Sequence, residues 1–174
     1  MPVEAAVAVI YKGSGPDIEL LFIRRRERPG DPWSGHIAFP GGRRREGDSS
    51  LMDTVIREVM EEVGIDLRRE AEFVCTARPT GTLVNPDIII YPYVFRYLGE
   101  GGVRSSDEVG EAFWIPIREL RQGICMRFLT PLEDIASVRC FRWLRRRDVV
   151  IWGVTYRIFR SVMREVFGVD PDSL

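Results

Sequence analysis

The feature that most constrains this chain is a glycine turn followed by a helix that carries three glutamates. Gly41 and Gly42 form the turn, and the acidic residues Glu58, Glu61 and Glu62 follow at positions i, i+3 and i+4. Residues at these spacings lie on one helical face, with about 5–6 Å between their Cβ atoms. Because like charges there weaken an isolated helix by about 0.2–0.5 kcal/mol per pair, the pattern predicts a cation among the carboxylates.

Carboxylate oxygens of this kind favour a hard divalent cation. Mg²⁺ takes oxygen ligands and usually retains waters and substrate phosphates, and Mn²⁺ accepts a similar set. We expect Glu58 and Glu62 to be the first metal ligands, with Glu61 completing the cluster or contacting the metal through water. A Glu-x-x-Glu-Glu run alone is usually a solvated helix face, but the preceding glycine turn favours a metal-dependent phosphate site.

The length, net charge and apolar runs of the chain limit the classes of protein to which it can belong. The 174 residues suffice for one domain with a sizeable core, so we expect a single domain over residues 1–174. A formal net charge of −1 provides no global basic field for a nucleic-acid partner. Because no apolar run approaches the length of a membrane span, we expect no membrane partner either.

The cysteines and the N-terminal residues predict a location. Cys75, Cys125 and Cys140 are odd in number and lack metal-type spacing, so we expect buried thiols in a reducing compartment. The first ten residues contain Glu4 and no basic region, unlike a secretory signal. Together these observations predict a cytoplasmic protein.

Hydrophobic periodicity and turn residues predict an α/β (α+β) fold in which helices cover a mixed sheet. The helix that carries the glutamates spans about residues 49–63, with Asp48 or Ser49 as its cap and Gly64 at its end. A second helix spans 156–167, a short helical turn 117–121, and a long polar loop 99–110, whereas 128–138 is ambiguous. The predicted strands are 3–11 and 18–23, which form a hairpin, and 36–39, 72–77, 87–97, 112–115 and 149–152.

From Gly42 onward the residues resemble the signature of the Nudix hydrolase family. That signature is a glycine, five residues, an acid, a spacer, and then Arg-Glu-apolar-any-Glu-Glu-any-Gly-apolar, here Arg57 to Ile65. Two departures are Asp48 in place of a glutamate and an eight-residue spacer in place of seven. Both are similar to the coenzyme A pyrophosphatase branch of the family.

Three other segments resemble the same branch. They are the residues leading to the glycine turn (20–24 and 35–42), the Tyr-Pro-Tyr-Val of 91–94, and the Ile-Trp-Gly-Val-Thr of 151–155. The loop between Arg24 and Gly35 is longer than the branch pattern, and it would help to shape the substrate pocket. The resemblance implies a Nudix-type α/β/α sandwich over about residues 20–167.

The resemblance also implies an activity, in which water attacks a phosphorus of a nucleoside diphosphate derivative with Mg²⁺ or Mn²⁺ as cofactor. The branch implies cleavage of coenzyme A or its derivatives to adenosine 3′,5′-bisphosphate and 4′-phosphopantetheine. The alternatives are ADP-ribose, dinucleotides or non-canonical nucleotides as substrate, or a non-catalytic nucleotide-binding module. Because dimers are common in the family, the resemblance also allows a homodimer.

The family resemblance also implies roles for individual residues. The family pattern implies that the Gly42 carbonyl joins the metal and that Arg57 holds one glutamate in its ligating orientation, with a surface salt bridge as the alternative for Arg57. Family members draw their general base either from the signature helix or from a later loop. Glu61 and Glu108 are the corresponding candidates, and we favour Glu108 as base or additional ligand over an exposed loop acid.

The sequence constrains the residues that contact substrate less than it constrains the metal ligands. Arginines in the loop before the turn suit phosphate, and the resemblance favours Arg24 among them. Of the three arginines after the turn we expect no more than one to touch phosphate, and we choose Arg43. Trp33 is a candidate to stack an adenine, with a core or lid role as the alternative. His36, the only histidine, predicts a structural role.

Overall fold

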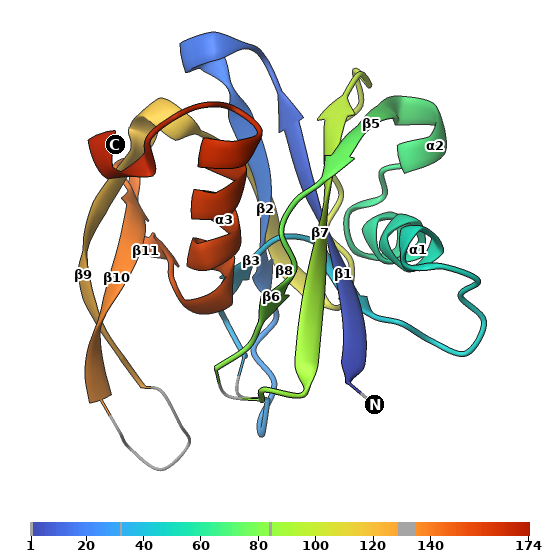
Figure 1. The fold of residues 1–174 in the computed structure, drawn as a ribbon, viewed down its shortest axis with the longest axis horizontal. Coiled ribbons are helices and arrows are strands. Elements are labelled where there is room, and N and C mark those ends of the chain that lie inside the picture. Colours follow the sequence, from blue (N-terminus) through green and yellow to red (C-terminus); the bar gives the residue numbers. More distant parts are fainter. Residues whose placement is uncertain (1, 32, 84, 129–134) are drawn as a thin grey trace.

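A central sheet of eight strands lies between the two long helices (Figure 1). This computed structural model describes residues 2–31, 33–83, 85–128 and 135–174. Helix α1 (Leu51–Val63) packs on one face of the sheet and helix α3 (Gly153–Glu165) on the other. The layered mixed fold predicted from the sequence is therefore confirmed.

The main path of the sheet runs in the order β3-β2-β1-β7-β5. Strands β1 and β7 are parallel, from Val3 opposite Ile88 to Tyr11 opposite Arg96, and the other pairs are antiparallel. The predicted hairpin is confirmed, because Tyr11 pairs with Leu20. The strands are β1 (Val3–Lys12), β2 (Glu19–Arg25), β3 (Ile37–Ala38), β4 (Gly41–Arg43), β5 (Ala71–Thr76), β6 (Thr80–Gly81), β7 (Ile88–Tyr97) and β8 (Val109–Pro116).

Residues on alternate sides of β1 and β2 fill two separate cores, because successive side chains of a strand point to opposite faces. Ala6, Ala8 and Ile10 pack toward α1, whereas Leu20 and Phe22 pack in the core that includes α3. The small alanine side chains let α1 lie close to β1. This packing holds the signature helix firmly against the strand beside the glycine turn.

The structure also specifies the ends of α1. Ser50 caps it by accepting a hydrogen bond from the Asp53 N–H at 3.1 Å, so the predicted cap at Asp48 or Ser49 was wrong by one or two residues. The Asp48 carboxylate pairs with Arg57 instead. Gly64 ends the helix in the left-handed region at φ 70°, as the sequence predicts, because glycine adopts that conformation without a Cβ penalty.

A second sheet of three antiparallel strands lies beside α3 in the order β11-β10-β9 (Figure 1). These strands are β9 (Leu120–Phe128), β10 (Ile135–Trp143) and β11 (Arg146–Ile151). The sequence predicts only β11, because arginines interrupt the apolar alternation of the other two. Of the ambiguous stretch 128–138, residues 129–134 lie outside the described residues.

The pairing of β9 with β10 overturns the expectation of three thiols. It places Cys125 opposite Val138 and Cys140 opposite Gly123, and the two cysteines form a disulfide with a Cα–Cα separation of 6.2 Å. Only Cys75 is a free thiol among the described cysteines. Because disulfides persist in oxidising environments, the cysteines no longer support a reducing compartment.

Short elements complete the fold. The predicted helical turn is the 3₁₀ helix η2 (Ile117–Glu119), and the long loop ends two residues earlier than expected, where β8 begins at Val109. No helix in the described part of the chain is long and apolar enough to cross a membrane. The remaining helices are α2 (Leu67–Glu70), η1 (Gly15–Asp17) and η3 (Pro171–Ser173).

Candidate active site

Two of the three signature glutamates are buried and the third is not. Glu58 is 5% exposed and Glu62 4% exposed, whereas the Glu61 side chain is 44% exposed. The difference follows from helix geometry, because Glu58 and Glu62 are one turn apart on the side of α1 that faces the sheet. The structure therefore pairs Glu58 with Glu62 and leaves Glu61 at the rim.

Gly41 and Gly42, which the sequence predicts as a turn, are instead the first two residues of β4. This glycine segment lies directly against the two carboxylates. The Gly41 N–H donates to Glu62 Oε2 at 2.8 Å. A Cβ on Gly42 would lie 2.6 Å from Glu58 Oε1, and one on Gly41 would lie 2.2 Å from the Ala6 carbonyl oxygen. Both positions consequently require glycine, for reasons that the signature alone does not reveal.

Arg57 connects Asp48 with Glu58. Its guanidinium donates two hydrogen bonds to Asp48, at 3.0 and 2.8 Å, and one to Glu58 Oε1 at 2.7 Å. The backbone N–H of Arg45 and the buried Thr54 hydroxyl also donate to Asp48, at 2.9 Å each. These bonds hold the pKa of Asp48 well below its usual range, with the Arg57 bond the largest cause. Arg57 therefore contacts both Asp48 and Glu58 directly.

A second arginine, Arg45, reaches the carboxylates from the turn. It lies 3.4 Å from Glu61 Oε2 and 3.6 Å from Glu58 Oε1. The sequence favours Arg43 in this region, but the Arg43 side chain is exposed, and its carbonyl accepts a hydrogen bond from Arg57 at 3.4 Å. Among the arginines after the turn, Arg45 is therefore the one nearest the acidic pair.

The charge of Glu62 is poorly compensated. Burial is the largest cause that raises its pKa, to about 8, and the neighbouring charge of Glu58 adds to the shift. The Gly41 hydrogen bond and the charge of Arg25 act in the opposite direction. A bound cation would oppose the same repulsion.

The donor set fits a divalent cation of the hard class. Glu58 and Glu62 provide buried oxygens, and the glycine turn removes side chains that would block them. In the described residues no three His, Cys, Asp or Glu side chains are grouped as in a ready-made metal site. Arg45 and Arg57 pair with Glu58 and Glu61, so a cation would compete chiefly with the exposed Arg45.

The loop residue Glu108 and the β8 residue Glu111 differ in how far other side chains already engage their carboxylates. Glu111 is engaged by Arg146, and it lies 3.6 Å from Arg24 Nε. Glu108 is exposed, its carbonyl accepts from the Arg26 N–H at 3.2 Å, and its charge contributes to the raised pKa of Glu62. Glu108 therefore lies within electrostatic reach of the site, and its carboxylate has no ion-pair partner among the described residues.

Arg24, the predicted substrate contact, belongs to a different network. It pairs with Asp148 of β11 at 2.6 Å and with Glu111 at 3.6 Å, and Arg146 contacts the same two acids. These ion pairs connect β2 and β8 of the large sheet with β11 of the small sheet. The structure thus engages Arg24 in holding the two sheets together.

Arg25, one position further along β2, lies on the other face of the sheet, on the side of α1. Its charge lowers the pKa of Glu62, and its guanidinium pairs with Asp31 at 3.1 Å. Its buried Nε has no hydrogen-bond partner in the described residues. The alternation of side chains along a strand was the signal that could have separated Arg25 from Arg24.

The loop that carries Trp33 packs beside β2 and β3. The Trp33 N–H donates to Asp31 Oδ1 at 3.0 Å, and Trp33 is partly exposed. The His36 ring packs edge-on against Trp152, with centroids 4.8 Å apart, which fits the structural role predicted for it. Asp31 therefore joins the loop to Arg25 and to the rim of the site.

Comparisons with known proteins agree with this geometry. A family model described as NUDIX domain matches residues 1–144. An uncharacterized Nudix hydrolase, NudL, of Citrobacter koseri is 32% identical over 169 residues, covering 87% of this chain and 82% of its own. An uncharacterized protein of Schizosaccharomyces pombe is 40% identical over 113 residues, covering 61% of this chain but 34% of its own, so this chain matches about a third of it.

A solved structure has the same fold. The MutT/nudix family protein from Enterococcus faecalis superposes with a TM-score of 0.62 at 19% identity, covering 99% of this chain and 66% of that one. At this identity the likeness shows the fold alone.

Substitution of Gly42 tests the close contact with Glu58. In Gly42→Ala the new methyl group must displace the Glu58 carboxylate from its position beside Arg57. We expect Mn²⁺ affinity, measured by titration calorimetry, to fall about 10–100-fold, as when a group that orients a ligand is lost. Gly47→Ala, in the connection between β4 and α1, is the matched control, because nothing lies within 4 Å of a Cβ there. Equal affinity in the two variants would contradict this account.

Proposed function

This chain belongs to the NUDIX domain family, and we propose that it hydrolyses a diphosphate bond in a nucleoside diphosphate derivative, with coenzyme A or one of its derivatives as the substrate. The observation that carries the proposal is the burial of Glu58 and Glu62 side by side against Gly41 and Gly42. Two buried acids that repel each other have no evident structural use. Their arrangement fits the binding of a divalent cation and, with it, an anionic substrate.

Glu58 and Glu62 would hold Mg²⁺ or Mn²⁺, with the Gly42 carbonyl as a further donor and Glu61 as a ligand at the rim. When bound, the cation would neutralise diphosphate charge and polarise a phosphoryl oxygen. Arg57 keeps the Glu58 carboxylate oriented through its hydrogen bond at 2.7 Å, and Asp48 fixes Arg57 in turn.

Substrate phosphate would meet arginine on two sides. Arg25 has a buried, unpaired Nε among the described atoms and is held by Asp31, so it suits a phosphate oxygen. Arg45 pairs only at 3.4–3.6 Å with the acids, and it would be free for phosphate once a cation replaces it there. The exposed Arg43 and Trp33 remain candidates for the outer phosphate and the adenine.

Glu108 is the proposed base for the attacking water. Its carboxylate would accept a proton from the water, provided that it lies within hydrogen-bond reach when substrate is bound. Glu61, which is exposed and paired with two arginines, is the alternative within the signature helix. Glu111 is a weaker candidate, because Arg146 and Arg24 already engage it.

The coenzyme A assignment rests on two departures within the signature and on two sequence segments outside it. Asp48, the eight-residue spacer and the segments 91–94 and 151–155 all resemble that branch. The engagement of Arg24 with Asp148 and the longer loop around Trp33 leave room for another nucleoside diphosphate derivative. A nucleotide-binding module without activity is a third reading, and the intact acidic pair argues against it.

A substrate panel tests the function itself. We expect purified protein with Mg²⁺ or Mn²⁺ to cleave coenzyme A faster than ADP-ribose or a dinucleotide, with mass spectrometry detecting adenosine 3′,5′-bisphosphate and 4′-phosphopantetheine. Much faster turnover of ADP-ribose would overturn the coenzyme A assignment but keep the hydrolase. Inactivity on every diphosphate, combined with tight nucleotide binding, would support the binding module.

Neutralising Glu62 tests the acidic pair. Glu62→Gln retains the shape and an acceptor for the Gly41 N–H but removes one charged ligand, so we expect kcat to fall on the order of 100-fold or more. Its melting temperature should not decrease, because burial disfavours the charged carboxylate. The exposed Glu46→Gln is the matched control. A near wild-type rate in Glu62→Gln would refute the role.

Neutralising Glu108 tests the base. If Glu108 accepts the proton, Glu108→Gln should lower kcat by about 10²–10⁴-fold with little change in metal affinity. The neighbouring, exposed Asp107→Asn should leave kcat unchanged. A loss of only a few-fold, accompanied by weaker metal binding, would instead assign Glu108 as an auxiliary ligand.

A further inference from the structure

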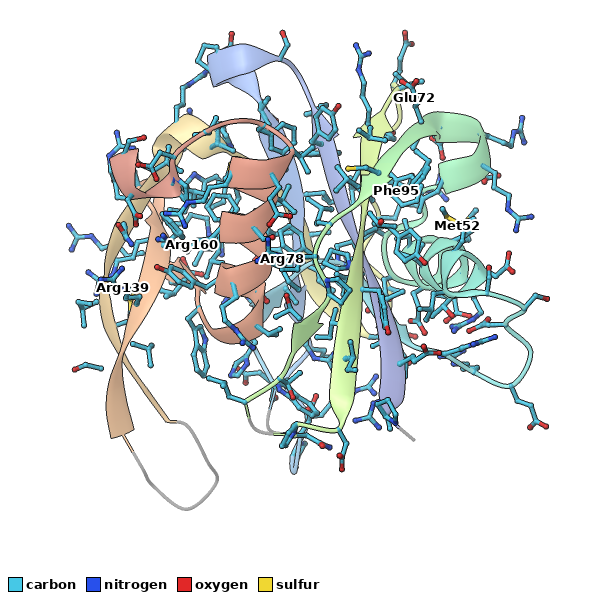
Figure 2. All side chains as sticks on the ribbon, in the orientation of Figure 1. Met52, Glu72, Arg78, Phe95, Arg139 and Arg160 are labelled. Atoms are coloured by element: carbon cyan, nitrogen blue, oxygen red, sulfur yellow. A yellow bond between two sulfur atoms is a disulfide. The ribbon has the colours of Figure 1, made fainter. Side chains whose placement is uncertain are left out.

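An arginine-rich hollow lies between α3 and the segment that follows β5, on the face of the sheet opposite α1. Its volume is about 470 Å³. Figure 2 labels two of its lining residues, Arg78 and Arg160, on the α3 side of the large sheet. The candidate active site, on α1 and β4, is in the other layer, so this hollow is a separate feature.

The lining of this hollow is strongly cationic. Four arginines line it, whereas its only acidic lining residue is Glu165; the arginines are Arg78, Arg157, Arg160 and Arg164. Arg78 pairs with Glu165 at 3.2 Å, and Arg160 and Arg164 pair with Asp172 at 2.5 and 2.7 Å. Arg157 has no carboxylate partner among the described residues. Its guanidinium is fixed by donating to the Gly81 carbonyl of β6.

Two residues that line the hollow each have a buried polar atom that lacks a hydrogen-bond partner. These atoms are Arg157 Nε and Ser161 Oγ, and neither has a partner in the described part of the chain. The two residues are four positions apart in α3, so they lie on one face of the helix, one turn from each other. Buried polar atoms are nearly always hydrogen-bonded. The missing partners of Arg157 Nε and Ser161 Oγ therefore indicate that a ligand binds at this side of α3.

The chemistry of these groups selects an acceptor with negative charge. Arg157 Nε–H is a donor only, and the Ser161 hydroxyl has one O–H that can donate to an anion. Arginine matches the oxygens of a phosphate group in geometry as well as in charge. The small volume fits a small molecule better than a polymer, and the net charge of −1 gives no long-range attraction for a polyanion.

We propose that this hollow is a binding site for a phosphate group, held between Arg157 and Ser161 on α3, of free phosphate or of a small phosphorylated metabolite. Arg78, Arg160 and Arg164 surround the site and raise the local concentration of anions. The proposal depends on neither the metal nor the hydrolase activity, because none of its residues belongs to the acidic pair or the glycine turn.

The test is calorimetric titration of the full chain with inorganic phosphate in EDTA, so that no metal contributes at the acidic pair. We expect saturable binding with one site, and a Kd that rises at least about 10-fold in Arg157→Gln and several-fold in Ser161→Ala. The exposed Arg147→Gln, on β11, is the matched control and should bind as the wild type does. Glu62→Gln should also bind normally, which separates this site from the acidic pair.

Glycerol phosphate distinguishes the two sources of the group. Tighter binding of the ester than of inorganic phosphate would support a phosphorylated metabolite, and the reverse would support free phosphate. Ser161→Ala removes only one oxygen, so it keeps the proposal testable if Arg157→Gln is poorly folded by its melting curve. Absence of saturable binding at tens of millimolar phosphate, unchanged affinity in both variants, or loss of binding in Glu62→Gln would overturn it.

Discussion

The contact on which the site depends is the close approach of the two glycines of β4, which have no side chains, to two buried carboxylates. Gly41 donates to Glu62 at 2.8 Å, and the space where a Gly42 side chain would begin is filled by the Glu58 carboxylate. This approach is possible because α1 lies on the small side chains of Ala6 and Ala8. A larger residue at any of these positions would move the helix or the turn and separate the acids from the backbone.

Burial disfavours the charged form of these two acids. Burial is the largest cause of the raised pKa of Glu62, and the charge of Glu58, which water cannot screen there, adds to it. Arg57 and Asp48 are fixed by several hydrogen bonds, whereas Arg45 reaches the acids only at longer distances. We infer that the two arginines have different roles. Arg57 holds the Glu58 carboxylate in place, whereas a bound cation would displace Arg45 from the acids and leave its guanidinium free to bind substrate.

Sequence reasoning succeeded where the signal is local. The α1 helix, its glycine end and the first hairpin follow from periodicity and turn chemistry, and the spacing of the glutamates identified the family. It failed where the signal is a pairing between distant segments. The hairpin of β9 and β10 joins Cys125 to Cys140, but their spacing gives no hint of it. The sequence does not distinguish Arg24 from Arg25, because both are arginines in a segment predicted to be a loop. In the structure they lie on opposite faces of β2, where Arg24 pairs with Asp148 and the charge of Arg25 acts on Glu62.

The sequence by itself determined that a pair of glycines precedes a helix with acids at i, i+3 and i+4, because helical geometry is a property of neighbouring residues. It also determined the two helices and most strands of the large sheet. Only the tertiary structure decided that Glu58 and Glu62 are buried while Glu61 is exposed, and that Arg25 rather than Arg24 lies on their side of the sheet. The physical reason is that burial and charge pairing depend on which surfaces the sheet brings together, and those surfaces come from segments far apart in the chain.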